Sequence, residues 1–224
     1  MTLRKAQAVP DLAALPIAPE YLQRFIVDAH VIVAEGYARL DPGTLATKEE
    51  PDISGLIVRN SRGWLDDPGS PEWTRSYFVT EEKLEDESPL EGMRRPRIDV
   101  HIESNIRRPR PRFVFEAKRL YRSDSVAEYV GGKGLGALCD GTYAGSAGAA
   151  GMLGYVQTGG VDESAARVGK KLAREREAHG LSADGVVWTE VQLDVRLGTT
   201  RVSRHARAGR AWLDVYHSFL RCCA

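Results

Sequence analysis

Three side chains with the chemistry of a hydrolytic site lie between residues 99 and 118, namely Asp99, Glu116 and Lys118. Two carboxylates can hold a divalent cation through oxygen, and a lysine beside them can orient or activate a water molecule. The segment around Glu116 and Lys118 is rich in β-forming residues, so these side chains, two positions apart, point to the same face of a strand. Together the three are sufficient to hydrolyse a phosphodiester bond.

Two strands joined by a basic turn must bring these side chains together. Residues Arg97–Glu103 alternate between apolar and polar side chains, which predicts a strand with Asp99 on its polar face. Residues Arg112–Lys118 predict the second strand. The turn Ser104–Pro111 is interpreted as lying beside the candidate site, and its arginines are expected to contact the phosphates of a nucleic acid: Arg107, Arg108 and Arg110.

The spacing of these residues resembles a known family signature. Asp99, sixteen further residues and then Glu116-Ala117-Lys118 are similar to the motif of the PD-(D/E)XK nuclease superfamily, although Ile98 stands where that motif has a proline. The resemblance implies a restriction-endonuclease-like α/β fold, with a mixed central sheet flanked by helices. It also implies that Asp99 and Glu116 bind Mg²⁺, with Mn²⁺ as a substitute and the Ala117 carbonyl as a further ligand, while Lys118 positions the attacking water. The alternative is a cross-sheet Glu-x-Lys ion pair in an ordinary hairpin.

A further acidic residue precedes this hairpin. Nucleases of the superfamily often carry one more acid on the helix before the core hairpin, and Glu50-Pro51-Asp52-Ile53 resembles that pattern. Glu50 is the candidate metal ligand, and Glu49 is the neighbour with which it can be confused. The alternative is that these acids only complement the dipole of the helix.

Segments after the hairpin resemble restriction-type proteins of bacterial defence loci. They are Tyr129-Val130, Asp140–Tyr143, Ala150–Val156 (AGMLGYV), Ser203–Arg207 and Val215–Leu220. The small residues around AGMLGYV are expected to let a helix pack close against the sheet. His205 and Arg207 are expected to hydrogen-bond either a phosphate or an adjacent strand, and Arg119 joins the set of candidate DNA-contacting residues.

The composition is typical of a globular protein, with 224 residues, 28% of them charged, and a formal net charge of +0. The charge is segregated, because residues 94–122 hold ten Arg and Lys against three acids, whereas residues 81–91 hold six acids against one lysine. The basic segment is suited to binding a polyanion. The three cysteines form no CxxC pair, and GGKGLG at residues 131–136 fits neither a Walker loop nor a dinucleotide fingerprint, so neither zinc nor nucleotide binding is indicated.

Hydrophobic periodicity and proline positions predict the remaining elements. Residues 1–18 are interpreted as an extended arm, because their prolines disfavour regular structure. A helix is expected from Pro19 to about Leu40, with His30 on its surface or at its boundary, and a second helix begins at Pro51. The other elements are a short strand at Tyr77–Val79, a helix over residues 162–178 and a strand over residues 187–195.

Residues 19–224 are therefore expected to form one nuclease-like domain behind the arm. The expected function is that of a Mg²⁺-dependent endonuclease acting on DNA in bacterial restriction or defence, in the cytoplasm and without a membrane segment. One alternative is a catalytically silent nuclease-fold subunit that serves a larger assembly as a structural or DNA-binding component. The other is a ribonuclease with the same site. A partner protein or a homo-oligomer is compatible with each.

Overall fold

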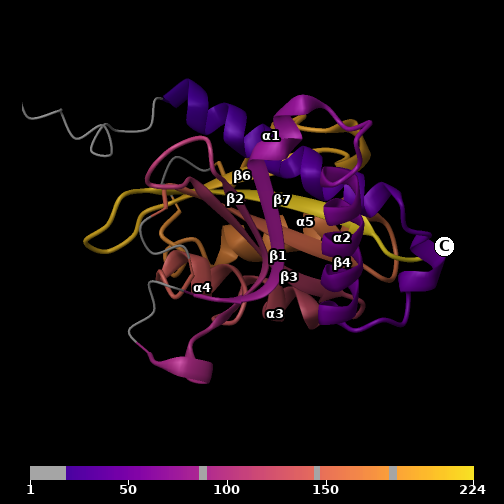
Figure 1. Cartoon of the computed structure of the whole chain (residues 1–224). Coiled ribbons are helices and arrows are strands. Elements are labelled where there is room, and N and C mark those ends of the chain that lie inside the picture. Colours follow the sequence, from indigo (N-terminus) through magenta and orange to yellow (C-terminus); the bar gives the residue numbers. More distant parts are fainter. Residues whose placement is uncertain (1–18, 86–89, 144–146, 182–185) are drawn as a thin grey trace, which may run out of the picture.

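A seven-stranded mixed sheet organises the chain, with helices on both of its faces (Figure 1). The structure, a computed structural model, describes residues 19–85, 90–143, 147–181 and 186–224, so the expected arm over residues 1–18 lies outside the described residues. The strand order is β1-β2-β3-β4-β7-β6-β5, in which β3, β4 and β7 are parallel neighbours and the other pairs are antiparallel. The strands are β1 (Tyr77–Leu84), β2 (Arg97–Ser104), β3 (Arg112–Leu120), β4 (Ala149–Val156), β5 (Thr189–Val191), β6 (Thr200–His205) and β7 (Leu213–Arg221). The expected α/β class with a mixed sheet between helices is confirmed.

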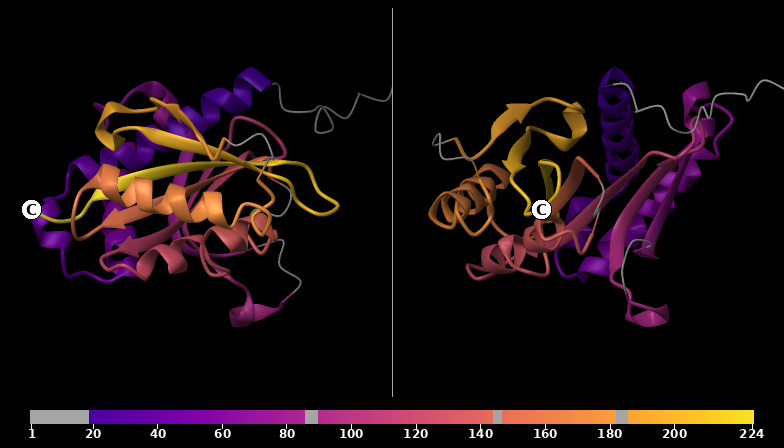
Figure 2. Two further views of the ribbon diagram at one scale, coloured as in Figure 1. Left: turned by 180° about the vertical axis from the view of Figure 1, so that it is seen from behind. Right: turned by 90° about the vertical axis from the view of Figure 1, so that its left-hand side faces the viewer.

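Two hydrophobic cores lie on opposite faces of this sheet (Figure 2). One core is formed with α1 (Pro19–Ala38) and α2 (Glu50–Leu65), and the other with α3 (Ser125–Val130), α4 (Leu135–Cys139) and α5 (Val161–Arg174). Short 3₁₀ turns are η2 (Pro42–Leu45), η3 (Glu72–Ser76), η4 (Gly92–Arg94) and η5 (Val195–Leu197). Across the described ranges, no helix has both the length and the apolar character needed to span a bilayer.

The expected hairpin is present as β2 and β3, each slightly longer than predicted. The helices expected from Pro19 and from Pro51 are also confirmed, and α2 starts one residue earlier, at Glu50. The helix expected over residues 162–178 is α5, which begins at Val161 after Gly160 and ends at Arg174. The strand expected at Tyr77–Val79 extends to Leu84.

The segment AGMLGYV is a strand of the sheet, and its small residues do not serve the close helix packing that was expected of them. It forms β4, between two parallel neighbours, and every one of its residues is buried. Its glycines make room for aromatic rings instead: a Cβ on Gly151 would lie 2.1 Å from Cδ1 of Phe115, and one on Gly154 would lie 2.7 Å from Cδ1 of Phe219. A central parallel strand is buried on both faces, so its sequence loses the alternation that identifies an edge strand.

The strand expected over residues 187–195 is interrupted in the structure. Only β5 is regular, because the Asp194 carboxylate accepts a hydrogen bond from the Arg196 amide and starts the 3₁₀ turn η5. Trp188 leaves the strand and packs against His217 and Gly169. The alternation in the sequence therefore overstated the length of this edge of the sheet.

His30 is fully buried, whereas the helical pattern placed it at the surface or boundary. Its Nδ1 lies 2.7 Å from the carbonyl oxygen of Ile26, and its ring contacts three aromatic side chains of the sheet: Phe113, Phe115 and Tyr216. Burial lowers the pKa of His30 to about 4, so the imidazole is neutral. Because α1 packs against both α2 and η5 as well as the aromatic side chains of the sheet, more of its circumference is covered than the apolar stripe alone indicates.

Candidate active site

The antiparallel pairing of β2 with β3 stops at Val100, before the N-terminal end of β2, and the candidate site begins there. The paired residues run from Glu103 and Arg112 to Val100 and Phe115. At the next position the amide of Ala117 donates a 2.7 Å hydrogen bond to the carboxylate of Asp99. A side-chain oxygen thus takes the place of a ladder carbonyl, and Asp99 is held against the backbone beside Glu116.

Lys118 lies at the centre of the cluster. Its Nζ is 2.8 Å from Oε1 of Glu116, 2.8 Å from Oε1 of Glu50 and 2.5 Å from the carbonyl oxygen of Ala117. An ammonium has three donors, and all three are used. The expectation that Asp99, Glu116 and Lys118 approach one another, with Glu50 and the Ala117 carbonyl nearby, agrees with this arrangement.

The structure distinguishes the two glutamates that start α2. Glu50 enters the site, where its second oxygen also accepts a 3.3 Å hydrogen bond from the amide of Arg119. Glu49 points outward and pairs with the guanidinium of Arg119 at 2.9 Å and 2.7 Å. Glu50 is therefore the acid of the cluster, and Arg119, a candidate DNA contact, is held by Glu49 and by the carbonyl of Lys48.

The cluster holds three carboxylates against one ammonium in a mostly buried place. Glu116 is 4% exposed, and the side chain of Lys118 is 12% exposed. Burial, with the charge of Asp99, raises the pKa of Glu116 to about 9, and burial raises that of Asp99 to about 6. Burial lowers the pKa of Lys118, but the surrounding carboxylates outweigh it and the net shift is upward. Near neutral pH the proton therefore stays on Glu116, because one ammonium cannot balance one buried and two half-buried carboxylates.

The donor set fits a hard divalent cation by its chemistry. Carboxylate oxygens of Asp99, Glu116 and Glu50, with the Ala117 carbonyl, are the ligands that Mg²⁺ and Mn²⁺ prefer. Within the described ranges no group of three or more His, Cys, Asp or Glu is arranged to hold a metal ion. The reason is visible in the distances: Lys118 lies between Glu116 and Glu50, and Asp99 is bonded to the backbone. The ammonium occupies the centre in this conformation.

Tyr143 is a neighbour of the site that sequence reasoning did not assign to it. Burial raises the pKa of its phenol, and the charges of Glu116 and Asp99 raise that pKa further, so both acids act on the phenol electrostatically. Its segment, Asp140–Tyr143, was singled out only for its resemblance to restriction-type proteins. A tyrosine more than twenty residues beyond the hairpin gives no local signal of this interaction, because the interaction is set by the tertiary fold.

The arginine turn between β2 and β3 does not lie beside the acidic cluster, contrary to expectation. Asp99 is five residues from Ser104, so the turn begins about 17 Å along the strand. Arg110 is paired with Glu103 at 2.6 Å, and Arg107 lies over the ring of Tyr21 at 5.0 Å. This turn contacts the start of α1, at the far end of the hairpin.

His205 and Arg207, the other candidate DNA contacts, are buried. Arg207 donates to the carbonyl oxygens of Ala211 and Ala147, so it holds two loops together. His205 ends a chain of side chains that links Tyr129, His217 and Ser203 through contacts of 3.0, 2.7 and 2.6 Å. Of the two roles left open by the sequence, bonding within the protein is the one observed.

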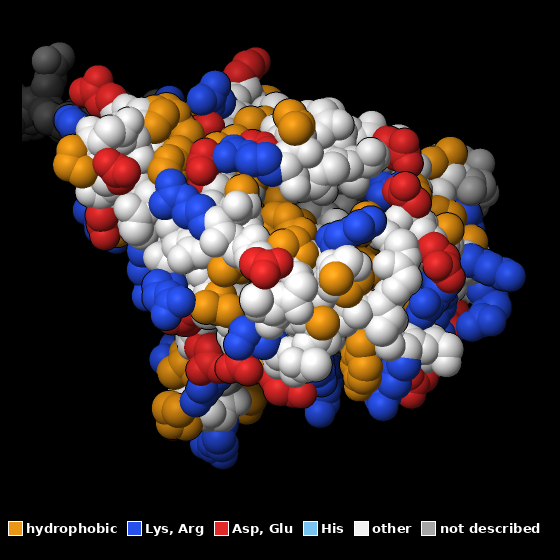
Figure 3. Space-filling model, turned by 90° about the vertical axis from the view of Figure 1, so that its right-hand side faces the viewer, with side chains coloured by type: hydrophobic (Ala, Val, Ile, Leu, Met, Phe, Trp, Pro, Cys, Tyr) orange, Lys and Arg blue, Asp and Glu red, His pale blue; other side chains and the backbone are white. Residues whose placement is uncertain are grey.

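Several cations of the basic segment over residues 94–122 form ion pairs, most of them with acids outside the segment. The paired side chains are Arg97 with Glu82, Arg110 with Glu103, Arg119 with Glu49, and Arg122 with Asp124 and Glu128. Figure 3 shows Lys and Arg interspersed with Asp and Glu on the face it presents, without a single basic patch. The local excess of cations in the sequence therefore does not become one basic surface there.

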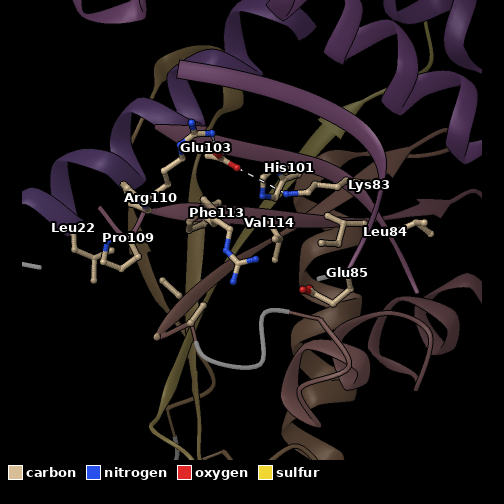
Figure 4. Close-up of a pocket in the computed structure, with 16 residues that line it drawn as sticks. Leu22, Lys83, Leu84, Glu85, His101, Glu103, Pro109, Arg110, Phe113 and Val114 are labelled. Carbon is tan, nitrogen blue, oxygen red and sulfur yellow. Dashed lines mark hydrogen bonds and ion pairs between the residues drawn. The ribbon is translucent and has the colours of Figure 1, made fainter. Parts of the chain in front are cut away.

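A groove of about 600 Å³ lies further along the sheet, between the site and the arginine turn. It is lined by His101 and Val114, which lie two positions from Asp99 and Glu116 on the same strands and hence on the same face. Figure 4 shows Glu103 between Lys83 and Arg110 on its wall, at 3.8 Å and 2.6 Å. Apolar side chains such as Val114 and Leu84 provide the rest of the lining.

Comparisons with protein-family models, with curated proteins and with solved structures found no match to this chain.

Proposed function

We propose that the protein is a divalent-metal-dependent nuclease with a restriction-endonuclease-like site, acting on DNA in the cytoplasm as part of bacterial defence. The observation that carries the proposal is the convergence of Asp99, Glu116 and Glu50 around the single ammonium of Lys118. A hairpin ion pair needs one carboxylate for its lysine, whereas a hydrolytic metal site needs several. The surplus of buried acids costs folding free energy, and a bound cation would offset it.

The residues have distinct roles in this proposal. Asp99, Glu116, Glu50 and the Ala117 carbonyl hold the metal, which when bound polarises the phosphate and lowers the pKa of a bound water. Glu116 gives up its proton to become a ligand, since metal ligands must be deprotonated. Lys118, released from the two glutamates, donates to the attacking water or to a phosphoryl oxygen as negative charge develops.

The groove beside the site supports a polymeric substrate. It runs along the same face of β2 and β3, and its lining combines the cations Lys83, Arg110 and Arg112 with two acids and apolar side chains. Of these acids, Glu103 pairs with Lys83 and Arg110. A nucleic-acid strand presents phosphates and apolar base faces in alternation, which such a lining can contact. The choice of DNA over RNA rests on the resemblance of the motif to that of restriction nucleases.

A cleavage assay tests the proposal directly. Plasmid DNA, linear DNA and RNA are incubated with the protein and Mg²⁺, Mn²⁺ or EDTA. Cleavage is expected with either metal and not with EDTA, and Asp99→Ala and Lys118→Ala are expected to abolish it. Two exposed residues near and far from the site serve as matched controls, Asp52→Ala and Lys170→Ala, and are expected to cleave normally. Turnover by Asp99→Ala or Lys118→Ala at the wild-type rate would refute the assignment.

A catalytically silent subunit is the second candidate, and one observation favours it. Lys118 satisfies its three acceptors without a metal, and the described residues contain no preformed group of metal ligands. Such a protein would bind nucleic acid or a partner of a defence complex without hydrolysis. Isothermal titration with Mn²⁺ separates the two candidates. A nuclease is expected to bind Mn²⁺ as wild type and to lose this binding in Glu116→Gln, whereas a silent subunit binds no Mn²⁺ at this site in either form.

A further inference from the structure

Gln157 connects the end of β4 to the segment that leads into α2. Its side chain is 4% exposed, and its Nε2 donates 2.8 Å hydrogen bonds to the carbonyl oxygens of both Leu45 and Lys48. Its backbone amide bonds the carbonyl of Leu120, at the end of β3. The side-chain amide of Gln157 therefore binds two carbonyls of the segment before α2. The backbone of Gln157 is itself held at the ends of β3 and β4, the strands next to the site.

This connection holds the segment before α2, and the guanidinium of Arg119 donates to the same Lys48 carbonyl at 3.4 Å. The N-cap residue Glu49 makes no side-chain capping hydrogen bond, so the first turn lacks the usual device that holds a helix start. Lys48, whose carbonyl Gln157 binds, is two residues before Glu50. Fixing that carbonyl therefore restricts the position from which the Glu50 side chain reaches Lys118.

We propose that Gln157 is a positioning residue for Glu50, holding this carboxylate in the cation-binding cluster without touching the cation or the substrate. The hydrogen bonds from Gln157 to the carbonyls of Leu45 and Lys48 form what we call the clamp. The inference rests on the proposed function, because it assigns the clamp a role in metal binding. Replacing a residue that positions a metal ligand without binding the metal commonly lowers metal affinity by about 10–100-fold. An effect of that size is expected here.

The test variant is Gln157→Met, which keeps an unbranched side chain of similar volume and removes both donors. The matched control is Asn60→Ala, because Asn60 also donates its amide group to a backbone carbonyl, that of Gly36 at 3.2 Å, but at the other end of α2. Urea unfolding of each variant confirms that it is folded under the assay conditions. Mn²⁺ affinity from isothermal titration is expected to fall about tenfold or more in Gln157→Met and less than twofold in Asn60→Ala.

A double-mutant cycle shows whether Gln157 acts through Glu50. In the Glu50→Gln background, Gln157→Met is expected to change Mn²⁺ affinity less than about twofold, because the carboxylate that it positions is already gone. A full tenfold effect in that background would overturn the inference, since Gln157 would then act by another route. So would wild-type affinity in Gln157→Met alone.

A measurement without metal separates this inference from the proposed function. The amide of Arg119 donates to Glu50, so its NMR chemical shift reports where that carboxylate lies. Gln157→Met is expected to shift this resonance and to speed hydrogen exchange in the first turn of α2, and Asn60→Ala is expected to leave both unchanged. If wild-type protein binds no Mn²⁺, the proposed function fails by itself, and an unmoved Arg119 resonance in Gln157→Met would refute the clamp.

Discussion

Lys118 Nζ and Glu116 Oε1, two residues apart on β3, lie 2.8 Å from each other, yet the pKa of Glu116 is raised to about 9. An ion pair alone would lower the pKa of the acid. Burial and the neighbouring charge of Asp99 outweigh it, so the site carries more acid than its one lysine can balance.

Replacing the buried Glu116 is expected to raise the stability of the fold while it abolishes cleavage. Glu116→Gln keeps the shape and the hydrogen-bonding ability of the side chain and removes the ionisable group. The variant is expected to unfold with a free energy higher by on the order of 2 kcal/mol at pH 7.5, because no proton has to be held on a carboxyl that would otherwise ionise. Its cleavage is expected to be lost. Urea denaturation with a plasmid assay measures both, and a less stable Glu116→Gln would contradict the account.

The pH dependence of stability is expected to have two limbs. The pKa of Glu116 is higher folded than unfolded, so the folded state binds more protons and stability falls as pH rises from about 5 towards 9. Burial lowers the pKa of His205 and of His30 to about 4, and it lowers that of His217 as well. For these groups the unfolded state binds more protons below about pH 6.5, so stability falls as pH drops from there towards 4.

Unfolding measured from pH 4 to 9 is therefore expected to show a maximum near pH 6–7. Glu116→Gln should flatten the alkaline limb and steepen the acid limb above about pH 5, where Glu116 otherwise opposes the histidines. An alkaline limb of equal slope in both proteins would mean that Glu116 is ionised in the free protein.

The two glutamates at the start of α2 form a natural pair of test and control. Glu50→Gln is expected to reduce the rate of cleavage by about 100-fold or more, because Glu50 lies in the cluster with Lys118. Glu49→Gln removes only an exposed partner of Arg119, whose surface ion pair contributes about 0–1 kcal/mol, so a change of less than about threefold is expected. Equal losses in both variants would show that the helix terminus acts only through its charge.

The glycines of β4 are expected to be sensitive to a single methyl group. A Cβ at Gly151 would lie 2.1 Å from the ring of Phe115, so Gly151→Ala is expected to destabilise the fold by about 1–3 kcal/mol or more. Gly63, exposed in α2, meets nothing within 4 Å, so Gly63→Ala is expected to stabilise by about 0.5–1 kcal/mol. Thermal unfolding of the two variants measures the contrast, and equal shifts would mean that Phe115 moves aside freely.

The sequence by itself determined the hairpin, its acidic and basic residues and the two leading helices. These follow from local causes: β2 alternates with period two, the Glu116 and Lys118 side chains share a face because they are two apart, and Pro19 and Pro51 lie in the first turns of helices. Such patterns depend on the chain within one turn or one strand, so they can be read without the fold.

Only the tertiary structure decided which residues meet. Glu50 rather than Glu49 reaches Lys118, the two acids act on the phenol of Tyr143, and the arginine turn lies at the far end of the hairpin. The same holds for β4. Its glycines were expected to allow close packing of a helix, but they face aromatic rings of the neighbouring strands. The physical reason is shared: burial and partners come from segments distant in sequence, and a side chain's pKa, pairing and exposure are set by those neighbours rather than by its own position in the chain.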